Sequence, residues 1–272
     1  MGSVCRGSQR RKESAVNLEG KVGVVTGSSR GVGKNIALEL ARAGADVVIA
    51  ARTEAESDPK LPGTIYSTAE EIAAETGRRA IPVKVDVTKD EDLRKMVDEA
   101  MEKFSRVDIL VNNAGIMIPG KLIDTPLKRW DLAWRVNVRA ALAACQMVLP
   151  HMLKRGSGTI IFISSEAAEI KGEGNMSYSV TKQADRKVAE GLAEELKDTG
   201  VSVFAISPEG IVMSPGVLYH GTHEMYPGHD VEDPEDTGRA AVLLASGAID
   251  DRSGEHFYSR ALLRENAELV KG

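Results

Sequence analysis

Short apolar runs alternate with helical segments along most of this chain. The runs are mostly apolar, which is typical of strands buried on both faces, and they occupy 22–25, 47–50, 80–85, 109–111, 159–163 and 201–206. Each gap is long enough for a crossover helix, and helical spacing places helices at about 32–43, 68–75, 91–104, 130–149 and 178–197. This alternation predicts a doubly wound α/β fold, a parallel sheet with helices on both faces.

The chain length and the N-terminal composition indicate one domain with a short tail. A chain of 272 residues can bury a single large core, so we expect one domain over 18–272. Residues 1–17 are basic but lack the apolar stretch of a secretory leader, which predicts a flexible tail. The most apolar long segment, 140–153, is too short for a bilayer and contains Pro150, so no membrane association is expected.

Charge and cysteine content narrow the class of partner. The net charge is -5 and the basic residues are scattered, so nucleic acid is not an expected partner. Cys5 and Cys145 are too few for a disulfide framework, which fits a reducing, cytoplasmic location. We therefore expect a protein that acts on a small molecule.

A glycine-rich turn, T-G-S-S-R-G-V-G, joins the first expected strand to the first expected helix. Glycines there let the backbone approach a pyrophosphate, and the helix N-terminus favours its negative charge. A glycine-rich turn alone is weak evidence, because turns need glycine for conformational reasons, but its position after the first strand strengthens it. The expected phosphate-binding residues are Gly27, Ser29, Arg30, Gly31, Val32 and Gly33.

The second strand ends without the carboxylate that NAD-binding sites offer to the adenine ribose. Arg52 and Thr53 stand there instead, and Arg52 with Arg30 can pair with a 2'-phosphate. This favours NADP(H) over NAD(H), although two surface arginines would give the same pattern. Asp86, followed by Val87, ends the third strand and can reach the adenine amino group, unless it is a simple turn aspartate.

Tyr178 and Lys182 form the most informative pair in the sequence. They lie four residues apart on an expected helix, on the same face, where a lysine ammonium favours the phenolate of a tyrosine. Such spacing also occurs by chance, so the context matters. Ser165, at the end of the fifth strand, can hydrogen-bond a substrate oxygen as charge develops, and Ser164 is the near alternative.

Further polar groups follow the fourth strand in the sequence N-N-A-G. Asn112 begins this motif and Ala114 and Gly115 end it, at the edge of the sheet where α/β proteins bind ligands. Asn137 lies in the next helix. Asparagines that only tie loops together are the competing interpretation for the motif.

Together these motifs resemble the short-chain dehydrogenase/reductase family over about 18–259. The resemblance implies a Rossmann-type fold with seven parallel strands and subunits that pair as dimers or tetramers. It assigns Tyr178 as the proton donor or acceptor, Ser165 as the residue that orients the substrate oxygen, and Lys182 as a ligand of the nicotinamide ribose. It also implies that Asn137 holds a water and that Asn112 lies near the adenosine ribose.

The chain departs from the family pattern in three places. After the sixth strand it reads Pro208-Glu209-Gly210 where relatives show Pro-Gly, and Pro208, Gly210, Ile211 and Val212 are the residues expected near the nicotinamide amide. Residues 58–65 resemble an insertion found in hydroxysteroid dehydrogenase-like members. Residues 253–259 lack the Asp-Gly-Gly ending of many relatives, so subunit packing can differ there.

Two long irregular stretches, 53–67 and 213–234, are expected to be functional. The second contains His220, His223 and His229, whose spacing fits no strong metal-ligand pattern, so we expect a lid over the substrate and no metal. Glu166 and Glu169 follow Ser165, where they would line a pocket or be solvated.

The sequence therefore predicts an NADP(H)-dependent oxidoreductase that interconverts a secondary alcohol and a ketone, with Tyr178 as general acid/base. Two other readings stay open at this stage: a dinucleotide-sensing regulator without catalysis, and an epimerase or dehydratase that uses the cofactor transiently. The residues do not specify the substrate or the physiological direction.

Overall fold

The computed structural model describes residues 16–270 except 57, 171–172 and 226–227. Most of the expected N-terminal tail, with Cys5, lies outside the described residues. Val16 and Leu18, at the start of the described residues, are buried in the hydrophobic core.

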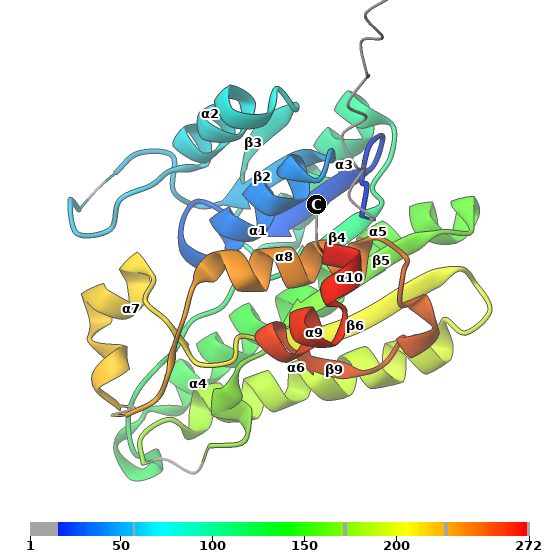
Figure 1. The fold of residues 1–272 in the computed structure, drawn as a ribbon. Coiled ribbons are helices and arrows are strands. Elements are labelled where there is room, and N and C mark those ends of the chain that lie inside the picture. Colours follow the sequence, from blue (N-terminus) through cyan, green and yellow to red (C-terminus); the bar gives the residue numbers. More distant parts are fainter. Residues whose placement is uncertain (1–15, 57, 171–172, 226–227, 271–272) are drawn as a thin grey trace, which may run out of the picture.

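Seven parallel strands form the central sheet (Figure 1). Their order is β3 (Ala80–Lys84), β2 (Asp46–Ala51), β1 (Val22–Thr26), β4 (Ile109–Asn112), β5 (Gly158–Ile163), β6 (Val201–Ser207) and β9 (His256–Tyr258). The chain builds outward from β1 to β3, then returns to β4 and builds in the other direction. This reversal between β1 and β4 creates the crevice where open α/β sheets bind ligands, and it confirms the predicted fold class.

Helices cover both faces of the sheet. One face carries α1 (Gly31–Arg42), α2 (Ile65–Thr76), α8 (Pro234–Ala245) and α9 (Ser259–Glu265), and in Figure 1 α1 and α8 lie side by side in front of the strands. The other face carries α3 (Asp90–Phe104), α5 (Ala140–Arg155) and α6 (Met176–Glu195). Successive strand residues point to opposite faces, so Val24 and Val25 belong to different cores.

The helix expected over 130–149 is interrupted in its middle. It consists of α4 (Leu127–Trp134), a π-helical segment η2 (Arg135–Arg139) and α5, and the wider turn contains Asn137. π-helical turns inside α-helices often occur at functional sites. Hydrophobic spacing could not reveal this turn because the apolar pattern runs through it.

The two stretches expected to be irregular contain more structure than the sequence suggested. Thr64 caps α2 through a reciprocal pair of hydrogen bonds with Ser67, so the first loop ends three residues earlier than expected. The second stretch contains α7 (Pro215–His220), which Ser214 caps by accepting a hydrogen bond from Val217 N–H. The expectation of an irregular segment is therefore wrong there. A Ser-Pro start is a known helix signal that the sequence offered.

The remaining elements are short. They are the paired strands β7 (Ile211–Val212) and β8 (Val231–Glu232), the helix α10 (Ala267–Val270) and the 3-10 turns η1 (Leu122–Asp124), η3 (Glu166–Ala168), η4 (Thr222–Met225) and η5 (Asp250–Arg252). Among the residues described, no helix combines the length and apolar character needed to cross a membrane.

Candidate functional site

A cleft of about 780 Å³ opens at the carboxyl edge of the sheet, beside the reversal point. Most of the residues predicted from the sequence line it; Asn112 and Asn137 do not. The predicted residues in its wall are Gly27, Ser29, Arg30, Gly31, Val32, Gly33, Arg52, Thr53, Asp86, Val87, Ala114, Gly115, Ser165, Tyr178, Lys182, Pro208, Gly210, Ile211 and Val212.

The glycine-rich turn forms a cradle that only glycine can build. A Cβ on Gly33 would lie 2.3 Å from Asn113 Nδ2 and 2.5 Å from the Gly27 carbonyl oxygen. Gly27 and Gly31 have φ values of +69° and +58°, in the left-handed region that favours glycine. The close backbone approach at the start of α1 leaves space and unpaired N–H groups suited to a pyrophosphate.

Asn113, rather than Asn112, faces the cleft. Its Nδ2 donates hydrogen bonds to the carbonyl oxygens of Thr26 (2.8 Å) and Gly27 (3.2 Å), which joins the loop after β4 to the cradle. Asn112 is buried on the opposite side of the sheet, with its Nδ2 3.5 Å from Cys145 Sγ. The sequence analysis passed over Asn113; the alternation of side chains along β4 is the signal that separates the two.

Basic and acidic groups lie at the end of the cleft where the sequence predicts the adenosine. Arg30 donates a hydrogen bond from Nη2 to the Gly63 carbonyl oxygen at 2.8 Å. Burial lowers the pKa of Arg30, and the charge of Glu56, which would raise it, does not outweigh burial. Arg52 is exposed at the cleft. Burial would raise the pKa of Asp86, but hydrogen bonds from the Thr88 hydroxyl and N–H outweigh it and lower that pKa, so Asp86 is a carboxylate.

The insertion over 58–65 packs against this end. Gly63 has a φ of +100°, and a Cβ there would lie 2.5 Å from the Ser29 carbonyl oxygen. The insertion therefore touches the cradle directly and fixes the Arg30 guanidinium.

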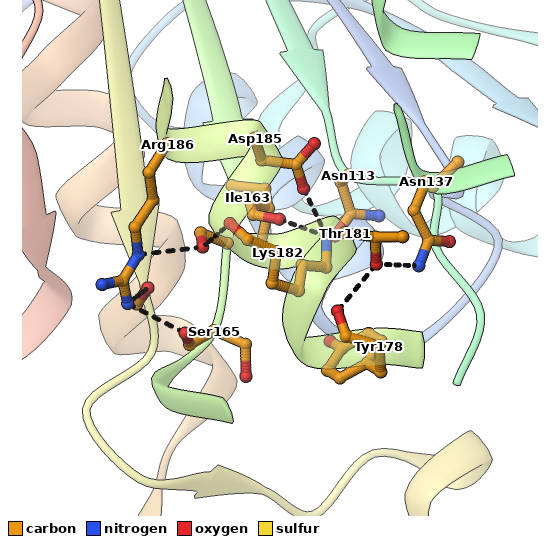
Figure 2. Close-up of polar contacts among 12 residues, drawn as sticks. Asn113, Asn137, Ile163, Ser165, Tyr178, Thr181, Lys182, Asp185 and Arg186 are labelled. Carbon is orange, nitrogen blue, oxygen red and sulfur yellow. Dashed lines mark hydrogen bonds and ion pairs between the residues drawn. The ribbon is translucent and has the colours of Figure 1, made fainter. Parts of the chain in front are cut away.

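Tyr178 and Lys182 project from α6 at the other end of the cleft (Figure 2). Lys182 is only 3% exposed, and its Nζ lies 5.8 Å from the centre of the Tyr178 ring. The ammonium donates to the Ile163 carbonyl oxygen at 2.6 Å and to Asp185 Oδ2 at 2.9 Å. This arrangement fixes a positive charge beside a phenol.

The two serines at the end of β5 have different surroundings. Ser164 is buried, donates to the Lys182 carbonyl oxygen at 2.8 Å and accepts from Arg186 Nε at 3.2 Å. Ser165 accepts from Ala167 N–H at 3.1 Å, and its hydroxyl proton has no acceptor among the described residues. Of these two serines, only Ser165 combines a place at the cleft with a hydroxyl that is available to donate.

Asn137 lies behind the cleft wall and braces it. Its Oδ1 accepts from Ile116 N–H at 2.8 Å, and its Nδ2 donates at 2.9 Å both to the Ile116 carbonyl oxygen and to Thr181 Oγ1. Thr181, which the sequence analysis missed, in turn donates to the Tyr178 carbonyl oxygen at 2.7 Å (Figure 2). Asn137 thereby joins the loop after β4 to the helix that carries Tyr178 and Lys182.

Comparison with known proteins agrees with this geometry. The family model described as short chain dehydrogenase matches residues 21–217, which contain both ends of the cleft. The chain belongs to the short-chain dehydrogenase family. It is 37% identical over 203 residues to hydroxysteroid dehydrogenase-like protein 2 from Danio rerio, a match that covers 74% of this chain and 48% of the relative. The chain thus spans about half the length of the curated relatives it matches first.

Two solved structures of family members extend the likeness. A 7α-hydroxysteroid dehydrogenase complexed with NADH and 7-oxo glycochenodeoxycholic acid is 29% identical with a TM-score of 0.77, covering 92% of this chain and 96% of that one. L-sorbose reductase from Gluconobacter frateurii, complexed with NADPH and L-sorbose, is 28% identical with a TM-score of 0.79, covering 90% and 96%. Both nicotinamide cofactors therefore occur among similar folds.

The Pro-Glu-Gly departure from the family's Pro-Gly does not obstruct the cleft. The Glu209 side chain is directed away to Arg264 Nη2 at 3.0 Å. Its backbone N–H donates to Glu232, a fully buried carboxylate that also accepts from Ser259 Oγ and Thr237 Oγ1. Glu232, which the sequence analysis missed, thus anchors the loop from outside while the residues around Glu209 keep their places in the wall.

The substrate side of this short-chain dehydrogenase contains titratable groups. His220, His223 and His229 all line the cleft, as does Glu166, whose carboxyl has a pKa raised by burial. Glu169 does not line it and instead binds Arg186 and the Tyr258 hydroxyl. The described residues contain no group of three or more His, Cys, Asp or Glu side chains placed to share a metal ion.

Proposed function

We propose that this chain is an NADP(H)-dependent oxidoreductase that interconverts a secondary alcohol and a ketone, with Tyr178 as the general acid/base. One observation carries the proposal: Tyr178, Lys182 and Ser165 line one end of a cleft whose wall also contains a glycine cradle. A phenol, an ammonium and a hydroxyl in one pocket provide a proton carrier, a charge to support it and a donor for the substrate oxygen.

The residues present fit a dinucleotide. The cradle at Gly33 leaves no room for a Cβ but gives backbone N–H groups at a helix N-terminus, which suits a pyrophosphate. Arg30 and Arg52 would pair with a 2'-phosphate and Asp86 with the adenine amino group, while Ile211 and Val212 would contact the nicotinamide amide. When bound, the nicotinamide supplies or accepts a hydride.

The protein groups have separate tasks in this chemistry. Tyr178 gives a proton to the substrate oxygen in ketone reduction, or takes it in alcohol oxidation. Ser165 donates a hydrogen bond to that oxygen, and Lys182 holds a positive charge beside the phenol at 5.8 Å from the ring centre. The histidine-lined segment around α7 would cover the substrate and exclude water.

The cofactor preference rests on Arg30 and Arg52. The two similar solved structures contain NADH in one case and NADPH in the other, so the family alone does not decide between them. In this chain the second strand is followed by a cation rather than a carboxylate, and a second guanidinium lies in the same part of the wall. This arrangement supports NADP(H).

The test is the Tyr178→Phe variant assayed against a panel of ketones and secondary alcohols with both cofactors. We expect turnover to fall by about 100-fold to 10,000-fold, because the proton carrier is removed, while the affinity for NADPH stays the same. Tyr66→Phe is the matched control, since Tyr66 is exposed on α2 and its hydroxyl binds Glu54.

Undiminished turnover in Tyr178→Phe would refute the proposal. A wild-type protein that binds NADPH tightly but converts no compound in the panel would favour a cofactor-sensing role. An internal redox cycle would convert substrate without net change in the absorbance of the reduced nicotinamide.

We further propose that the enzyme forms a homodimer or homotetramer in the cytoplasm. Leu142, Met176 and Val180 are exposed on α5 and α6, which supports burial of these helices against another subunit. Cys145 is a buried free thiol, which is compatible with a reducing compartment. Sedimentation velocity measures the subunit number.

A further inference from the structure

A buried carboxylate stands next to the Lys182 ammonium. Asp185 lies three residues after Lys182 on α6 and is 3% exposed, and its Oδ2 is 2.9 Å from Nζ (Figure 2). The Ile163 carbonyl oxygen of β5 accepts a second hydrogen bond from Nζ, at 2.6 Å. The protein itself therefore accepts hydrogen bonds from two of the three ammonium N–H groups, one of them at the Asp185 carboxylate.

Among the described residues on the elements that surround this ammonium, Asp185 is the acidic side chain that is buried beside it. β5, β6 and the loop over 113–118 contain no titratable side chain. On η3, Glu166 lines the cleft, while Glu169 just after it pairs with Arg186 of α6. The remaining charged groups on α4 and η2 are exposed: Lys128, Arg129, Asp131, Arg135 and Arg139, the last paired with Asp90.

A charge in this position needs a partner. Burial alone would lower the pKa of Lys182, but the Asp185 carboxylate and the Tyr178 phenol together outweigh burial and place that pKa above its ordinary value, while burial raises the pKa of Asp185. Lys182 therefore stays an ammonium across the neutral range. The same carboxylate reduces the positive electrostatic potential that the ammonium produces at nearby groups, including the Tyr178 ring 5.8 Å away.

We propose that Asp185 is a positioning residue for the reaction, which fixes the Lys182 ammonium and offsets its positive charge beside Tyr178. The proposal rests on the function proposed above. It is tested on ketone reduction, the direction in which Tyr178 donates a proton. In that step the Tyr178 O–H bond breaks, the proton goes to the carbonyl oxygen, and the carbonyl carbon takes a hydride from the reduced nicotinamide, which becomes oxidised.

Removal of the negative charge should make the phenolate easier to form. In Asp185→Asn, ketone reduction should be lost at lower pH than in the wild type, because reduction needs the phenol and activity falls as it ionises. We expect the alkaline limb of kcat/KM to move down by about one pH unit, the size of effect that one nearby charge produces. Asp185→Glu, which keeps the charge, should restore the limb to within a few tenths of a unit.

α6 also provides a matched control. Glu190 forms a pair of the same spacing with Lys187, at 2.7 Å, but both side chains are exposed to solvent. Glu190→Gln removes a carboxylate from the same helix and should leave the pH profile unchanged, because solvent screens the exposed pair.

The ultraviolet absorbance of tyrosinate gives a readout that needs neither cofactor nor turnover. For each protein, subtraction of the same protein with Tyr178→Phe isolates the ionisation of Tyr178. We expect this ionisation to occur at lower pH in Asp185→Asn by the same amount as the kinetic limb. If Asp185→Asn does not fold, Asp185→Ser, which leaves room for water beside the ammonium, replaces it in both measurements.

Coincident tyrosinate titrations of the wild type and a folded neutral variant would overturn the proposal. A shift in Asp185→Glu as large as that in the neutral variants would overturn it as well, because packing rather than charge would then be the cause. A wild type that turns over no substrate counts against the proposed function alone, since the tyrosinate titration still decides the role of Asp185.

Discussion

The two ends of the cleft are built in different ways. At the catalytic end, Lys182 and Asn137 are 3% and 2% exposed, and each side chain makes several hydrogen bonds to separate elements. At the end expected to hold adenosine, Arg52 is exposed, and the Asp86 side chain accepts hydrogen bonds from the neighbouring Thr88. The groups proposed to act in catalysis belong to the core of the protein, whereas the groups expected to select the cofactor lie in contact with solvent.

This difference has a consequence for substitutions. A change in a buried hydrogen-bonded group leaves its partners unsatisfied and is felt in both stability and activity. A change in an exposed charge alters a screened interaction and leaves the fold intact. Effects on this protein should therefore decrease from the catalytic end, through the cradle, to the adenosine end.

Among substitutions outside the Tyr178–Lys182 pair, Asn137→Ala should have the largest effect. The variant leaves the N–H and carbonyl oxygen of Ile116 without their side-chain partner, at about 1–3 kcal/mol for each group left unsatisfied, and Thr181 keeps only its hydrogen bond to the Tyr178 carbonyl oxygen. We expect the free energy of unfolding in urea to fall by about 3 kcal/mol and kcat to fall by about 100-fold, because the helix that carries Tyr178 loses its brace.

Asn266→Ala is the control for this variant. It removes a single hydrogen bond, from Nδ2 to the Leu262 carbonyl oxygen, at the end of α9. Asn266 does not line the cleft. Its cost should be below about 1.5 kcal/mol with no change in kcat. Equal effects of the two substitutions would remove the contrast between the braced catalytic end and the rest of the molecule.

Gly33→Ala tests the cradle, which lies between the two ends. The new Cβ would lie 2.5 Å from the Gly27 carbonyl oxygen, and backbone cannot yield as a flexible side chain can. Overpacking of this kind costs about 1–3 kcal/mol, so we expect calorimetry to show NADPH affinity lowered by about 10-fold to 100-fold. Gly191→Ala, on α6 with no atom within 4 Å of the new Cβ, should bind NADPH like the wild type. Wild-type affinity in Gly33→Ala would mean that the pyrophosphate lies elsewhere.

The same contrast explains what could be read from the sequence. The strands, most helices and the Tyr178–Lys182 pair depend on local spacing, which the sequence displays directly. Local spacing does not reveal the Lys182–Asp185 pair, because Lys187 and Glu190 are also three residues apart. The side chains of Lys187 and Glu190 are 74% and 62% exposed, whereas each side chain of the Lys182–Asp185 pair is 4% exposed. Only the packing of α6 on β5 makes one pair a core feature and the other a surface one.

Contacts between distant segments were equally hidden. Glu232 accepts hydrogen bonds from residues before and after it in the chain, and nothing local marks it as buried. Asn113 binds the cradle across 86 residues, while its neighbour Asn112 faces the other core. A shift of one residue at the end of a strand changes the face that a side chain occupies, so motif position alone could not separate the two.

Arg52→Ala should have the smallest effect, confined to cofactor choice. Arg52 is exposed, so its interaction with a 2'-phosphate is screened by solvent, and we expect the ratio of NADPH to NADH affinity to fall by about 10-fold, or about 1.4 kcal/mol. NADH affinity and thermal stability should stay at wild-type values. Arg129→Ala, a substitution of an exposed arginine on α4, should change neither affinity.

Ionic strength sharpens this last comparison. An exposed cation loses its advantage for NADPH as salt rises, so the wild-type ratio should approach that of Arg52→Ala in high salt, whereas the ratio of the variant should change less. Arg30 is partly buried and already bound to the Gly63 carbonyl oxygen, so its contribution should persist in high salt. If the ratio of NADPH to NADH affinity is the same in Arg52→Ala and in the wild type, Arg52 does not recognise the phosphate. The salt dependence of this ratio in Arg30→Ala would then decide whether a single, partly buried guanidinium selects the cofactor.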